Sequence, residues 1–274
     1  MNKIAFFLLI ISFLAFQTAS SNCPQIGQFG AHFSEEFLYW VGNEKGLGFT
    51  NHSANVLTTD DFTHNSVINP TFKWDFGFRL GGGYTQSNCQ WSYQTYWTYL
   101  RSKAETQKSV NSGSPDFLGI YPIWSMGPDT LAGDYVSSAS SSWRLFMNMI
   151  DLIAQYNSSC FFNRLILMPF LGGRGVSLSQ KLTAQYSGGT FFNGVDHNVL
   201  HSSYLGAGPR LGLNADCYLA YGLSLFGRAA AAPIFGRFHI KQRETYLGNL
   251  RFSRSTVKHR LLLGADFAAG LRWK

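Results

Sequence analysis

The sequence is poor in charged side chains. Asp, Glu, Lys and Arg make up 14% of its 274 residues, whereas a soluble globular domain carries about 25%. The formal net charge is +7, from 22 Lys and Arg against 15 Asp and Glu. Aromatic residues reach 16%, and there are 28 glycines. This composition favours a strand-rich protein that turns one face toward lipid.

Long apolar runs are also missing from most of the chain. The N-terminal run at residues 4–16 is apolar except for Ser12, but a membrane-spanning helix needs about 20 such residues. It follows Lys3 and precedes a small, polar stretch, so residues 1–21 are predicted to be a cleaved signal peptide. No later run is long enough for a transmembrane helix.

Catalytic and cofactor motifs are absent from the sequence. It contains no Gly-x-Ser-x-Gly elbow and no His-Glu-x-x-His helix. Asp196, His197 and His201 would have metal-ligand spacing on a helix, but they fall in a predicted loop. We therefore expect no enzyme activity, no cofactor and no metal.

Cysteine is scarce, with Cys23, Cys89, Cys160 and Cys217 set far apart and without a metal-binding pattern. In an oxidising envelope they can form disulfides within the chain or with other envelope proteins. The spacing leaves the pairing open.

The strongest positive signal is a period-two alternation of apolar and polar residues, at 71–84, 176–186, 205–215 and 257–273. It predicts strands with two unlike faces. The residues that we expect to face lipid are Phe72, Trp74, Phe76, Phe78, Leu261, Leu263, Phe267 and Leu271. The residues that we expect to line the interior are Lys73, Asp75, Arg79, Arg174, Lys181, Arg210, Lys258, Arg260 and Arg272.

Weaker strand patterns and an aromatic-rich stretch at 90–101 fill much of the remaining chain, and the polar stretches 51–70, 102–142 and 191–203 are predicted external loops. Residues 22–274 are thus predicted to form one transmembrane antiparallel β-barrel of about 8 to 12 strands. A secreted, soluble β-sandwich or jelly roll is the alternative, but it would have shorter strands and more surface charge.

From residue 143 onward the chain resembles the Legionella-type major outer membrane protein family, whose members also occur in chlamydia-like bacteria. The matching segments are 148–152, 165–175, 179–180, 206–212, 264–267 and 270–273, together with the earlier 74–81. The resemblance implies an outer-membrane β-barrel described as pore-forming, and it does not imply a catalytic site. Barrels of this kind usually end in an aromatic residue, whereas Lys274 follows Trp273 here. The chain is therefore expected to be a shortened relative or to lack its last strands.

We expect an outer-membrane pore for passive diffusion of small hydrophilic solutes, with a mild anion preference because the predicted inner face is rich in Arg and Lys. The alternative is a non-conducting barrel with a structural or adhesive role in the envelope. Expected partners are outer-membrane lipid, lipopolysaccharide, the barrel-assembly machinery and disulfide-linked envelope proteins. The basic residues between 237 and 258 are expected to face anionic lipid headgroups, since an exported chain does not meet nucleic acid.

Overall fold

The computed structural model describes residues 30–53, 65–86, 91–110, 120–125, 135–157, 165–191, 194–220 and 223–273. This part of the chain is almost entirely β-strand, with one 3-10 turn at Gly189–Phe191. It contains no helix that is both long enough and apolar enough to cross a membrane. The predicted all-β class is confirmed. The predicted signal peptide, 1–21, lies outside the described residues.

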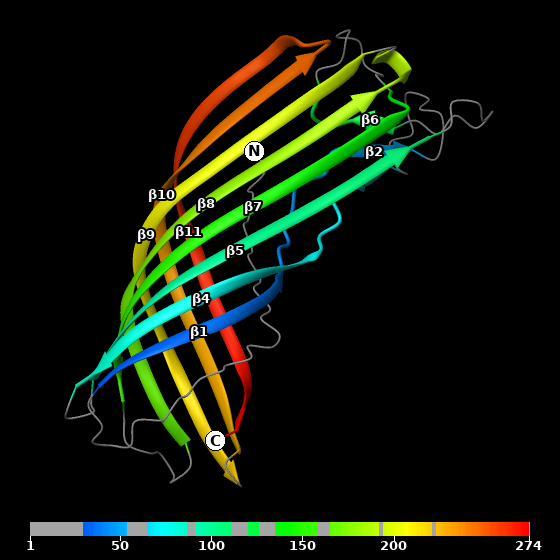
Figure 1. Cartoon of the computed structure of the whole chain (residues 1–274). Coiled ribbons are helices and arrows are strands. Elements are labelled where there is room, and N and C mark those ends of the chain that lie inside the picture. The colour runs from blue at the N-terminus through cyan, green and yellow to red at the C-terminus, as the bar shows by residue number, and fades with distance from the viewer. Residues whose placement is uncertain are drawn as a thin grey trace.

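Within the described residues, eight long strands form one antiparallel sheet in the order β1-β4-β5-β7-β8-β9-β10-β11 (Figure 1). Their bounds are Gly30–Val41 (β1), Trp74–Thr85 (β4), Trp91–Ser109 (β5), Ser138–Tyr156 (β7), Leu165–Ser187 (β8), Val195–Ala220 (β9), Leu223–Tyr246 (β10) and Asn249–Trp273 (β11). The sheet is strongly curved, since Trp40 of β1 and Ile234 of β10 belong to one packed core. Among the described residues no ladder joins the edge strands β1 and β11.

The two ends of the sheet differ in the length of their connections. At the end where β11 finishes, the lower end in Figure 1, the connections are residues 86–90, 157–164 and 221–222. At the upper end they include 42–73 and 110–137, which carry the small sheet β3-β2-β6. The bounds of this sheet are Thr50–Ser53 (β2), Asn65–Ile68 (β3) and Ile120–Pro122 (β6). In a transmembrane β-barrel the long connections lie at one end of the strands and the short turns at the other, and the sheet has this asymmetry.

A two-residue turn joins β10 to β11 at the upper end. Tyr246 pairs with Asn249, and between them Leu247 and Gly248 have φ values of 49° and 79°. Two consecutive positive φ angles are the signature of the type I′ hairpin turn. Glycine adopts this conformation freely, whereas leucine is strained in it.

The outer face of the sheet is apolar toward the lower end. We call this surface the apolar belt, and its residues include Phe37, Phe76, Trp91, Tyr93, Trp97, Ile150, Leu152, Leu171, Leu205, Leu211, Phe235, Leu261, Leu263, Phe267 and Leu271, all exposed. Cross-strand pairs such as Leu171 with Leu211 and Phe235 with Leu261 keep it continuous over neighbouring strands.

Toward the upper end the inner face of the sheet is apolar and the outer face is polar, which is the reverse of the lower end. On β8 the apolar residues Val176, Leu178 and Leu182 are buried inside the curved sheet, and the polar residues Ser177 and Lys181 lie exposed outside. The strands therefore continue past the apolar belt into a region whose outer face is polar. Water, rather than lipid, suits that outer face.

Two predicted loops were wrong in extent. Residues 191–203 were predicted to be a loop, but β9 begins at Val195, and the predicted loop 102–142 contains the end of β5 and the start of β7. The serine-rich start of β7 looks like a loop in sequence. In the structure Ala139 and Ser141 are buried on its inner face, so tertiary packing overrides the local composition.

Candidate functional site: an ion-pair cluster inside the sheet

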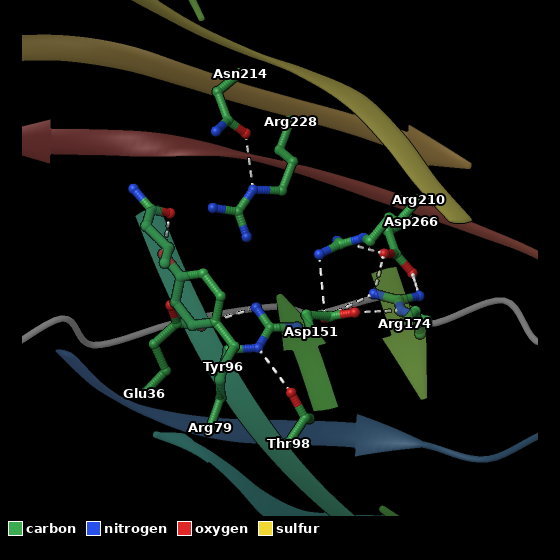
Figure 2. Close-up of polar contacts among 11 residues, drawn as sticks. Glu36, Arg79, Tyr96, Thr98, Asp151, Arg174, Arg210, Asn214, Arg228 and Asp266 are labelled. Atoms are coloured by element: carbon green, nitrogen blue, oxygen red, sulfur yellow. Dashed lines mark hydrogen bonds and ion pairs between the residues drawn. The ribbon is translucent and has the colours of Figure 1, made fainter. Parts of the chain in front are cut away.

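Four charged side chains meet on the inner face of the large sheet (Figure 2). They are Asp151 of β7, Arg174 of β8, Arg210 of β9 and Asp266 of β11, here called the charge quartet. Each lies on a different strand. The quartet therefore links β7 and β8 to β11 across the inside of the curved sheet.

Arg174 is the centre of the charge quartet. Its Nε and Nη2 donate to Asp151 Oδ1 and Oδ2 at 2.7 and 3.0 Å. Its Nη1 and Nη2 donate to Asp266 Oδ1 and Oδ2 at 3.0 and 2.6 Å. Arg210 completes the quartet, with Nη1 3.1 Å from Asp151 Oδ2 and Nη2 2.7 Å from Asp266 Oδ2. Such two-pronged contacts fix the geometry of both partners.

Burial and charge balance define the electrostatics of the charge quartet. The side chains of Asp151, Arg174 and Arg210 are only 2%, 3% and 2% exposed, whereas Asp266 is 22% exposed. Two positive and two negative groups cancel. Charges this buried are tolerated only when they are paired, so each member depends on its two oppositely charged partners.

Small residues let β11 reach β8 across two intervening strands. Gly208, Ala230, Ala232 and Gly264 lie on the same inner face as the charge quartet. A Cβ atom added at Gly208 would lie 1.8 Å from the carbonyl oxygen of Pro233. The tight approach of β9 to β10 thus requires glycine there.

A second polar layer lies nearer the lower end. Arg228 donates to Asn214 at 2.9 Å, and Asn214 donates to Gln155 at 2.7 Å. Arg79 contacts Glu36 at 3.2 Å and Thr98 at 2.9 Å (Figure 2). Below the charge quartet, the inner face is therefore lined by hydrogen-bonded polar groups at the level where the outer face is apolar.

Above the charge quartet the interior is packed with apolar side chains. We call this the upper core, and it comprises Leu38, Trp40, Leu47, Leu100, Ala104, Trp143, Leu145, Met147, Met149, Val176, Leu178, Leu182, Tyr204, Ala232 and Ile234. The upper core draws on β1, β5, β7, β8, β9 and β10. It fills the space between opposite sides of the wall.

Several residues predicted to line the interior do lie on the inner face. Arg174 and Arg210 meet in the charge quartet, Arg79 pairs with Glu36, and Asp75 accepts a hydrogen bond from the backbone N–H of Lys103 at 2.7 Å. Lys258 and Arg260 are exposed and lie on the same face of β11 as Asp266.

Of the other three predicted interior residues, the prediction is wrong for Lys181. Lys181 lies on the outer face of β8, because its apolar neighbours Val176, Leu178 and Leu182 pack in the upper core rather than against lipid. Lys73 is exposed just before β4 begins at Trp74. Arg272 is paired with Ser224 through its backbone, and its side chain lies outside the described part.

The residues predicted to face lipid lie on the outer face, with one exception. Leu263 and Phe267 are 73% and 71% exposed, and Phe76, Trp74, Leu261 and Leu271 are also exposed. Phe78 is half-buried, with its ring 5.2 Å from that of Trp97. Phe72 instead packs edge-on against buried Trp143. The alternation does not extend to it, because the regular strand begins only at Trp74.

The acids of the charge quartet were not among the predicted interior residues. Asp151 stands inside the apolar segment Met149–Leu152, and Asp266 shares the polar face of β11 with Lys258 and Arg260. Its position as an acid inside an apolar segment could have indicated that Asp151 lies on the inner face. Its partners come from strands far away in sequence, and the alternation does not reveal them.

The cysteine and metal expectations fall largely outside the described residues. Cys217 on β9 forms no disulfide there, and the other three cysteines lie in undescribed segments. The part of the chain that the structure describes holds no cluster of metal-ligating side chains. On strand β9 Asp196 is buried inside, while His197 and His201 are exposed outside.

A curved antiparallel sheet with an apolar belt outside and charged side chains inside is the architecture of a transmembrane β-barrel protein. The family model for the Legionella pneumophila major outer membrane protein precursor matches residues 29–274, nearly the whole chain. The chain belongs to this family. It is an outer-membrane protein, and the family is not an enzyme family. No curated protein and no solved structure matches the chain.

Proposed function

We propose that the chain forms a porin-like pore for small hydrophilic solutes, in which the charge quartet and the upper core above it are the narrow region. The observation that carries this proposal is the polar inner face behind the apolar belt. A wall that is apolar outside and polar inside suits a water-filled passage through lipid. Buried charges across such a passage filter solutes by size and sign.

The upper core limits how freely solutes pass. A solute that enters at the lower end meets the polar layer around Arg228 and then the charge quartet. Beyond the quartet lie Trp40, Trp143 and Met147 of the upper core, and dry apolar packing offers no path for a hydrated solute. Passage therefore requires the upper core to rearrange, and we expect small, infrequent conductance steps.

A mild anion preference belongs to the same proposal. The charge quartet is neutral, and Arg79 is balanced by Glu36. Lys258 and Arg260 add positive charge to the inner-facing side of β11. Within the described residues neither forms an ion pair with a carboxylate, so these two cations tip the balance toward anions.

Planar-bilayer recording tests the pore and its selectivity together. Refolded full-length chain should give conductance steps, and its reversal potential in a salt gradient should have the sign of an anion preference. Lys258→Gln with Arg260→Gln should reduce that preference. The matched control is Arg237→Gln with Arg243→Gln, two exposed residues on the outer face of β10, and it should not change the reversal potential. A clear cation preference of the wild-type chain would contradict the selectivity.

A second candidate is a non-conducting barrel with a structural or adhesive role in the envelope. The packed upper core favours it, as does the size of the large sheet, since eight strands, the number among the described residues, enclose an interior about wide enough for side chains alone. The same recordings separate the two candidates. A chain that is folded by β-rich circular dichroism and by a heat-modifiable gel shift, yet gives no steps, supports the non-conducting barrel.

A further inference from the structure

Basic side chains form a row across the outer face of five neighbouring strands. Lys103 of β5 pairs with Arg144 of β7, Arg144 with Lys181 of β8, Lys181 with His201 of β9, and His201 with Lys241 of β10. We call these five residues the basic row. They occupy a single level of the ladder, although they are scattered between positions 103 and 241.

All five side chains of the basic row project from the outer face. Arg144, Lys181, His201 and Lys241 are exposed, and Lys103 is half-buried. On every one of these strands the residues before and after the basic residue lie on the opposite, inner face, such as buried Gln180 and Leu182 around Lys181. The row therefore faces whatever surrounds the protein.

The spacing of the basic row is electrostatically unfavourable by itself. Neighbouring strands lie about 4.8 Å apart, and like charges that sit directly opposite each other destabilise a sheet. Among the described residues, no carboxylate lies within ion-pair distance of Lys103, Arg144, Lys181 or Lys241. An external anion that touches several of these side chains at once would relieve the repulsion.

The position of the basic row along the strands, relative to the apolar belt, indicates the kind of anion. On the same strands, toward the lower end, the outer face carries Trp97, Ile150, Leu211 and Phe235 of the apolar belt. The row lies above this belt, on the side of the long connections. In outer-membrane barrels the long connections lie on the side of the cell exterior, so that side corresponds to the outer leaflet, and the row lies near the level of its lipid headgroups.

We propose that the basic row binds the phosphate groups of lipopolysaccharide in the outer leaflet. Guanidinium and ammonium groups are the usual ligands of phosphate. Long Lys and Arg stems can reach down along the wall toward the headgroups while their charges stay in the polar layer. A row of cations suits a ligand with several phosphates better than a single free ion.

The test compares two triple variants of the full chain that remove the same charge. Lys103→Gln with Arg144→Gln and Lys181→Gln neutralises the basic row. Arg254→Gln with Lys258→Gln and Arg260→Gln removes three exposed cations from the inner-facing side of β11 and is the control. Binding of phosphorylated lipid A and of dephosphorylated lipid A to detergent-solubilised protein is titrated by native mass spectrometry. A heat-modifiable gel shift establishes folding, and the single variant Arg144→Gln replaces the triple variant if the latter does not fold.

The basic-row variant should bind phosphorylated lipid A at least about tenfold more weakly than the wild type, with the control within about twofold of it. Dephosphorylated lipid A should bind the wild type and the basic-row variant equally, and excess inorganic phosphate should not displace lipid A. The single variant should weaken binding to a smaller but measurable degree. Unchanged affinity of the basic-row variant, an equal loss in the control, or displacement by inorganic phosphate would overturn the proposal.

Discussion

At the scale of single residues, Asp151 has the largest expected effect on stability. It accepts from both Arg174 and Arg210, and its side chain is 2% exposed. Asp151→Asn should lower the free energy of unfolding by about 3–5 kcal/mol, because it leaves two buried guanidinium groups that share Asp266 as their counter-charge. Asp266→Asn should cost less, since that side chain is 22% exposed and water can screen the loss. Urea unfolding in detergent micelles measures both, and the reverse order of the two variants would refute this interpretation.

Glu44 in the connection between β1 and β2 should make stability depend on pH. Burial raises the pKa of this carboxyl from 4.5 to about 7. Between pH 4.5 and about 7 the folded chain keeps a proton on Glu44 that the unfolded chain releases. The free energy of unfolding is therefore highest below pH 4.5, and it falls as the pH rises through about 7. Glu44→Gln should remove this dependence and should be more stable than the wild type at pH 8. Urea midpoints across the pH range check it, and an unchanged pH profile in the variant would count against a buried Glu44.

At the scale of elements, the β10–β11 hairpin contains a correctable strain. Leu247 has φ 49° in a turn position that asparagine tolerates better. Leu247→Asn should stabilise the fold by about 1 kcal/mol, because it relieves the left-handed strain of a leucine. Leu250→Asn is the matched control, since Leu250 is also exposed but belongs to β11 and has no positive φ, and it should bring no gain. Equal effects of the two variants in thermal or urea unfolding would show that the turn is not the cause.

The alternation of apolar and polar residues was enough to predict the strands. It was not enough to predict which face of each strand points outward. Alternation at 176–186 correctly separates Val176, Leu178 and Leu182 from Ser177 and Lys181. It does not say which set faces lipid, because that depends on where along β8 the membrane ends. The same limit applies to the charge quartet, since the meeting of Arg174 with Asp266 depends on the curvature of the whole sheet.

At the scale of the whole molecule, the change from an apolar to a polar outer face predicts how far along the strands the membrane extends. The test introduces single cysteines into a cysteine-free variant and labels each with a dye. Dyes at positions 171, 211 and 267, in place of Leu171, Leu211 and Phe267 of the apolar belt, should be in contact with lipid acyl chains. At Lys181 and Gln185, further along the same outer face of β8, they should report water. Attached environment-sensitive dyes should be quenched by lipids spin-labelled in their acyl chains only at the first three sites. Strong quenching at Lys181 would mean that lipid covers the full length of the strand.

The order of strands in the chain has a consequence for assembly. Arg174 and Asp266 are 92 positions apart, and Asp266 belongs to β11, the last strand described. Until β11 is laid down, the nascent wall carries two guanidinium groups with only Asp151 to neutralise them. Placement of β11 supplies Asp266, the second acid of the charge quartet, so Arg174 and Arg210 are fully neutralised only when this strand has joined the sheet.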